Sequence, residues 1–181
     1  MADAKISQLG ELAAQPAATD EFVVVDKSDT TMAASGTDKK VQYSNLMGGA
    51  WQTWTPTFAN FTKGSATITA KYIQLGKTVH FRLAVVLAAD SSMGTSPTFT
   101  LPVTSVSYGT SGVSPIGVGT ILDNGTATYR MNVIWSSTTV CSITIYNVAS
   151  TYPIDAAITA TVPMTWTTGD EFTATGTYEA A

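Results

Sequence analysis

The sequence predicts an all-β protein: a β-sandwich or jelly-roll-like domain that follows a short N-terminal segment. Three observations lead to this prediction: the composition, an alternation of apolar and polar residues, and regularly spaced turns. Only 12% of the residues are charged while 44% are hydrophobic, so threonine, serine, asparagine and glutamine must supply most of the polar surface. Threonine is β-branched and suits a pleated strand, whereas the lysine and glutamate of exposed helices are scarce.

Alternation is the strongest sign of strands in the second part of the chain. Between residues 78 and 88, apolar side chains occupy every second position. The intervening positions carry Thr78, His80, Arg82, Ala84 and Val86. Because side chains of a strand point alternately to its two faces, this run predicts a strand with one buried face. The same alternation over 127–135, 141–146 and 172–179 predicts three further strands.

Turn signals separate these runs. Residues 74–77 contain Gly76 and join a strand around 66–73 to the strand that begins at 78. Asn124-Gly125 is a stronger signal, because both residue types tolerate a positive φ. Residues 136–139 give a weaker third turn, and prolines such as Pro97 are expected at strand ends or edges.

The composition changes near Gly48-Gly49, which divides the chain into residues 1–47 and a β-domain over 48–181. Most of the acidic residues precede this point, and the chain after it is rich in threonine. The first part contains only short elements, with strands expected near 22–26 and 39–42, and these bury too little apolar surface to fold alone. We therefore expect residues 1–47 to dock on a partner. The apolar candidates for this docking are Ile6, Leu9, Phe22, Val23, Val25, Val41 and Leu46.

Residues for catalysis or metal binding are scarce. His80 is the only histidine and Cys141 the only cysteine, so neither a cysteine-rich zinc site nor a disulfide within the chain is available. We expect His80 on a solvent or interface face and Cys141 as a buried, inert thiol. Asp170 and Glu171 follow Gly169 and are expected in a charged loop, although spacing alone leaves open a carboxylate pair for glycoside cleavage. The sequence thus predicts a protein without enzymatic activity, cofactor or metal.

The charge and hydropathy patterns argue against two classes of partner, nucleic acid and membrane. The net charge of −4 without a basic patch argues against nucleic acid. No apolar run is long enough to span a membrane, and residues 1–10 lack the pattern of a signal peptide, so we expect synthesis in a cytoplasm without Sec export.

The four tryptophans are expected in two environments. Trp51 and Trp54 open the second part, where they could close one end of the core, anchor a subunit interface, or stack on a glycan. Trp135 and Trp166 are expected in the core.

Several segments resemble proteins of bacteriophage particles. Residues 5–9, 19–26 and 37–46 resemble the N-terminal segment of phage fibre and head-appendage proteins, which anchors the appendage to the virion. Trp54-Thr55-Pro56-Thr57 and the ending 177–181 look like parts of phage virion β-domains, as do residues 72–79 and 99–103. The resemblance covers nearly the whole chain and implies a homotrimeric virion appendage. It carries over no catalytic residue.

Three functions follow from these expectations. The first is a capsid decoration protein or head fibre, bound to the major capsid protein or other virion proteins. The second is a tail fibre or receptor-binding protein whose β-domain binds a host surface glycan. The third, a glycan-degrading enzyme, is the weakest for the reasons above. The short chain has no coiled-coil or triple-helical shaft, which favours the capsid over the tail.

Overall fold

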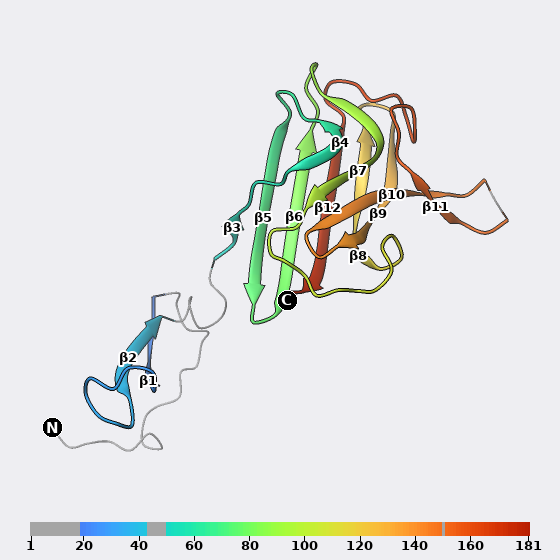
Figure 1. Ribbon diagram of the computed structural model, residues 1–181. Helices are drawn as coiled ribbons and strands as arrows, with labels where there is room; N and C mark the ends of the chain where they lie inside the picture. The colour runs from blue at the N-terminus through green and yellow to red at the C-terminus, as the bar shows by residue number, and fades with distance from the viewer. Residues whose placement is uncertain (1–18, 43–49, 150) are drawn as a thin grey trace, which may run out of the picture. The chain divides into compact units, whose positions relative to one another are not determined.

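The computed structural model describes residues 19–42, 50–149 and 151–181, and over these residues the protein is all-β without a helix (Figure 1). The predicted fold class is therefore confirmed. The chain divides into two compact units, Met1–Ala50 and Trp51–Ala181, a division close to the Gly48-Gly49 boundary that the composition indicated. None of the described residues belongs to a helix long and apolar enough to cross a membrane.

The first unit contains one antiparallel hairpin, made of β1 (Glu21–Asp26) and β2 (Thr37–Gln42). Its loop is held by carboxylates, because the Ser28 amide donates to Asp26 Oδ1 at 3.0 Å and the Thr31 amide donates to Asp29 Oδ1 at 3.0 Å. Aspartate commonly closes turns in this way, by accepting from the backbone two residues ahead.

The second unit is one antiparallel sheet whose strands are ordered β3-β5-β6-β12-β8-β9-β10-β7-β4, with β11 paired to β10. The strands are β3 (Gln52–Thr53), β4 (Phe58–Thr62), β5 (Thr67–Leu75), β6 (Thr78–Val86), β7 (Ser92–Thr100), β8 (Pro115–Asp123), β9 (Ala127–Ser137), β10 (Val140–Asn147), β11 (Ile154–Ala157) and β12 (Glu171–Glu179). The last strand in the sequence, β12, is inserted between β6 and β8, two strands from earlier in the domain.

The sheet folds over on itself into two layers. Figure 1 shows β5, β6, β12, β8 and β9 side by side, with β10, β7 and β4 crossing over them. Aromatic contacts join the layers: Phe61 and Phe172 meet edge to face with centroids 5.7 Å apart, and Phe81 and Phe99 lie 6.1 Å apart. Cys141 is fully buried in this core, as predicted, and burial raises the pKa of its thiol well above the usual value.

All the predicted turns are present. Gly76 lies in the turn between β5 and β6 at φ +59°, and Gly125 lies between β8 and β9 at φ +82°. Residues 138 and 139 connect β9 to β10. Pro97, which we expected at a strand end or on an edge strand, lies inside β7, between β10 and β4, and is buried. Its neighbour Ser96 has φ +53°, and the register of β4 against β7 shifts nearby, so an irregularity in the ladder accommodates the proline.

Gly176 of β12 leaves space for a core side chain of the neighbouring strand β6. A Cβ built on Gly176 of β12 would meet the ring edge of Phe81 and the carbonyl oxygen of Ile116. The absent side chain leaves room for Phe81, which is fully buried and central to the core.

Candidate functional site

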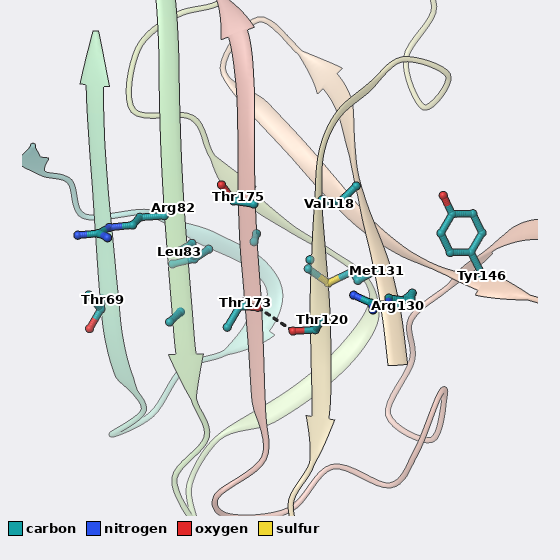
Figure 2. Close-up of a pocket in the computed structure, with 13 residues that line it drawn as sticks. Thr69, Arg82, Leu83, Val118, Thr120, Arg130, Met131, Tyr146, Thr173 and Thr175 are labelled. Atoms are coloured by element: carbon teal, nitrogen blue, oxygen red, sulfur yellow. Dashed lines mark hydrogen bonds between the residues drawn. The ribbon is translucent and has the colours of Figure 1, made fainter. Parts of the chain in front are cut away.

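The outward face of the larger layer carries a hollow of about 820 Å³ (Figure 2). Register explains which side chains line it. Ala84, Thr173, Thr120 and Arg130 are successive cross-strand neighbours on β6, β12, β8 and β9. The next row of neighbours begins with Arg82, Thr175 and Val118. These are alternate positions of strands whose other face is buried, so the rows point away from the core.

The floor of the hollow is made of small and hydroxyl-bearing side chains. Thr120 and Thr173 share a hydrogen bond of 2.9 Å across the β8–β12 pair, at the centre of Figure 2. Thr175 Oγ1 donates to the carbonyl oxygen of Phe81 at 3.2 Å. At one side Tyr146 of β10 is 51% exposed. Small floor residues between larger ones at the margins account for the concave surface.

A second hollow, of about 660 Å³, adjoins the first, and both are lined by Val118 and Thr175. It is lined as well by Trp51, His80 and Thr177. His80 Nδ1 and Thr177 Oγ1 are hydrogen-bonded at 2.8 Å. His80 therefore lies on the outer face, as the alternation predicted. We call the two hollows together the outer-face groove.

The only two arginines of the protein, Arg82 and Arg130, both line this groove. The guanidinium carbon of Arg82 lies 4.8 Å from the centre of the Trp51 ring, a cation–π contact that orients the side chain. Arg130 is exposed on β9. Among residues 19–42, 50–149 and 151–181, neither arginine forms an ion pair, and no carboxylate lines either hollow.

The structure separates the two tryptophans that the sequence paired. Trp51 is 42% exposed and lines the outer-face groove. Trp54 instead packs on the core, with its ring centre 6.0 Å from that of Phe81 and 6.2 Å from that of Phe99. Three roles were left open for this pair: closing the core, anchoring a subunit interface and stacking on a glycan. Trp54 closes the core, and the exposed ring of Trp51 is accessible to a ligand or to another subunit.

Trp135 and Trp166 have different surroundings from each other. Trp135 is buried, as predicted, and its Nε1 donates to Ser105 Oγ at 2.9 Å. Trp166 is partly buried against Phe172 and donates to the carbonyl oxygen of Thr159 at 2.9 Å.

The expected docking residues of the first unit lie on the β1–β2 hairpin where the structure describes them. Phe22 is 38% exposed, Val23 78% and Val25 55%, and Val41 is half-buried opposite Phe22. Val24 is also exposed, at 38%, and the sequence analysis had not selected it. Ile6, Leu9 and Leu46 lie outside the described residues.

Asp170 lies in the loop directly before β12, at a strand start as expected, and its side chain is turned inward. Its carboxylate is fully buried and accepts hydrogen bonds from the amide of Asn124 at 3.0 Å and from the amide of Thr167 at 2.6 Å. It thereby ties the loop before β12 to the β8–β9 turn. A carboxylate enclosed in this way has a structural role and offers no surface to a substrate. In the part of the chain that the structure describes, no three metal-ligating side chains come together.

The sequence contained a signal for the groove that pattern reading alone did not use. Arg82 and Arg130 occupy polar positions of two predicted strands and are the only arginines among nine basic residues. Their meeting on one face depends on β12 lying between β6 and β8, which local periodicity does not reveal.

Comparisons with protein-family models, with curated proteins and with solved structures gave no match for this chain, so no relative supplies a function for it.

Proposed function

We propose that this protein is a non-enzymatic structural component of a tailed bacteriophage virion, a capsid decoration protein or head fibre. Its first unit docks on the particle, and its β-domain projects. The observation that carries the proposal is the exposure of Val23 and Val25, at 78% and 55%, on a hairpin of only two strands. Such a hairpin is marginally stable by itself, so a partner that covers these side chains stabilises it.

The binding energy available to one docking segment is small, which favours an oligomer with several linked segments. Fully burying one valine or phenylalanine contributes about 1.5–3 kcal/mol. Ordering the segment costs about 1–2 kcal/mol per residue in backbone entropy. One chain therefore binds modestly. A homotrimer, the state implied by the resemblance to phage appendages, would bind more tightly, because its linked segments dock at a raised effective concentration.

Removing the docking segment tests the proposal. A protein that lacks residues 1–47 keeps all the strands of the second unit and should remain folded, with a β-type circular dichroism spectrum and a cooperative unfolding transition. It should no longer co-sediment with particles. Normal incorporation of the folded, truncated protein would contradict the proposal.

A tail fibre or receptor-binding protein is the second candidate, and the outer-face groove favours it. Both candidates share the docking unit and differ in where it binds. Labelling the protein on intact particles separates them: signal over the capsid lattice supports decoration, and signal at the tail tip supports receptor binding.

The absence of hydrolytic activity forms part of the proposal, supported by the buried, fully engaged carboxylate of Asp170. Glu171, its partly buried neighbour, is the remaining carboxylate of the pair. Incubation of host polysaccharide with the protein should release no reducing ends. Release that disappears in Glu171→Gln would overturn this part of the proposal.

A further inference from the structure

We propose that the outer-face groove binds an anionic saccharide, a sugar chain that carries carboxylate or phosphate groups. This inference goes beyond the structural role proposed above and concerns the second unit alone. It rests on charge, on the arrangement of hydroxyl and aromatic groups, and on the pairing of the strands beneath.

Charge is the first argument. The protein is acidic overall, with a net charge of −4, yet the groove contains both arginines and no carboxylate. Within the described ranges neither guanidinium is neutralised by an ion pair. Arginine presents a planar fork of donors that matches a carboxylate or a phosphate oxygen pair. An anion bound here would supply the partner that each arginine lacks.

The distance between the two arginines favours a ligand with several negative charges over a single small anion. Arg82 is on β6 and Arg130 on β9, three strand positions apart. At a strand separation of about 4.8 Å, this places their backbones about 14 Å apart across the sheet. Figure 2 shows them on opposite sides of the Thr120–Thr173 hydrogen bond. A small anion would engage one arginine, whereas a polymer with repeated charges would engage both.

The lining between and beyond the arginines suits sugar rings. Thr120, Thr173 and Thr175 line the groove, and although each hydroxyl is hydrogen-bonded within the sheet, it keeps acceptor capacity for a sugar hydroxyl. Exposed aromatic rings stand towards its two ends, Tyr146 in one hollow and Trp51 in the other. Such rings combine a flat apolar surface with a polar group, which matches the mixed surface of a pyranose.

An acidic peptide fits the same groove less well. Peptides commonly bind sheets by adding a strand at an unpaired edge. Here β6, β12 and β8 are each paired on both sides, so their backbone groups are used within the sheet. A peptide could bind only through its side chains, whereas a saccharide can use hydroxyls and acid groups along its length.

Calorimetry with the full-length protein tests the proposal. The ligands are hexagalacturonate, oligomeric sialic acid and a glycerol-phosphate oligomer. The control is fully methyl-esterified hexagalacturonate, which keeps the sugar backbone and loses the charge. We expect at least one anionic oligomer to bind about tenfold or more tightly than the neutral ester. The carboxylate and phosphate ligands show which anion is preferred. If no anionic oligomer exceeds the ester, or if inorganic phosphate binds as tightly as the oligomers, the proposal is wrong.

Three variants locate the site. Arg82→Gln and Arg130→Gln should each weaken binding about tenfold, because each removes a charge-assisted contact. Lys77→Gln removes the same charge in the turn between β5 and β6, outside the groove, and should change affinity less than twofold. Equal losses in all three variants would show attraction to net charge alone and would overturn the proposal.

Sedimentation of the same variants addresses the competing occupant, a second copy of this chain. The proposal predicts that Arg130→Gln leaves the oligomeric state unchanged. Dissociation of an oligomer by this substitution would identify the groove as a subunit interface and contradict the saccharide site. The particle experiments do not enter this test, so the structural proposal and the binding proposal can fail independently.

Discussion

The two units of this protein place the same residue type in opposite environments. Val23 and Val25 on β1 are 78% and 55% exposed, whereas Val79 and Val85 on β6 are fully buried. All four belong to antiparallel strands with regular pairing. The difference comes from what lies above the strand: β6 has a second layer over its inner face, and the two-stranded hairpin forms a sheet by itself. The local sequence forms strands in both units, but the valines of a strand become buried only where a second layer packs over it.

The comparison predicts that substitutions in the two units affect different properties, the folding stability of the second unit and the binding of the first unit to a partner. Substitutions at the buried core positions of the second unit should act on folding, because these side chains are already removed from water. Substitutions at the exposed hairpin positions should act on binding, because their apolar surface becomes buried only against a partner. The predictions below run from the largest expected effect to the smallest.

The largest effect is expected at the buried charge of the second unit. Asp170→Ala leaves the backbone amides of Asn124 and Thr167 without their acceptor. The free energy of unfolding should fall by about 3–5 kcal/mol, as measured in guanidinium chloride, because two hydrogen bonds to a charged group are lost. Glu171→Ala, one residue on and only partly buried, is the matched control and should cost under about 1 kcal/mol. Equal losses in the two variants would show that the hydrogen bonds of Asp170 add no stability beyond that of an ordinary carboxylate in this segment.

One substitution made in both units sharpens the comparison. Val85→Ala removes two methyl groups from a fully buried site and should lower the free energy of unfolding of the second unit by about 2–3 kcal/mol. Val23→Ala makes the same change at a 78% exposed site and should alter stability by less than about 0.5 kcal/mol. A large loss in Val23→Ala would mean that the hairpin is already covered in the free protein.

The smallest effect is expected from acid in the hairpin loop. The ion pair with Lys39 and the hydrogen bond from the Thr31 amide lower the pKa of Asp29 from its usual 3.8 to about 2. A lowered pKa stabilises the folded loop above the unfolded value, and this stabilisation is lost as the pH falls from about 4 through 2. The amide resonance of Thr31 should shift over that range. In Asp29→Asn the shift should be absent, and its persistence would assign it to another group.

The sequence predicted the strands and turns that depend on neighbouring residues. It did not predict the features that depend on residues distant in the chain. The run from Thr78 to Val86 alternates strictly, so β6 was predictable, as were the turns at Gly76 and Gly125. β7 was not predicted, because Pro97 and the glycine and serines around it are typical of a loop and become a strand only between β10 and β4. The buried state of Asp170 depends on Asn124, 46 positions earlier. The groove likewise requires the insertion of β12 between β6 and β8.

The central claim, that the hairpin binds while the domain folds independently, is tested most directly by one pair of charge substitutions. Val23→Asp places a charge at the most exposed valine of the hairpin, and Val113→Asp places the same charge at a 67% exposed valine before β8. Val25 is less suitable, because a Cβ on Gly36 would lie 2.7 Å from its Cγ1, and so Val25 also packs within the hairpin. The measurement is the amount of each full-length variant that co-sediments with purified particles. We predict that Val23→Asp is lost from particles with its unfolding temperature unchanged, and that Val113→Asp is retained. Retention of Val23→Asp, or equal loss of both variants, would contradict the account.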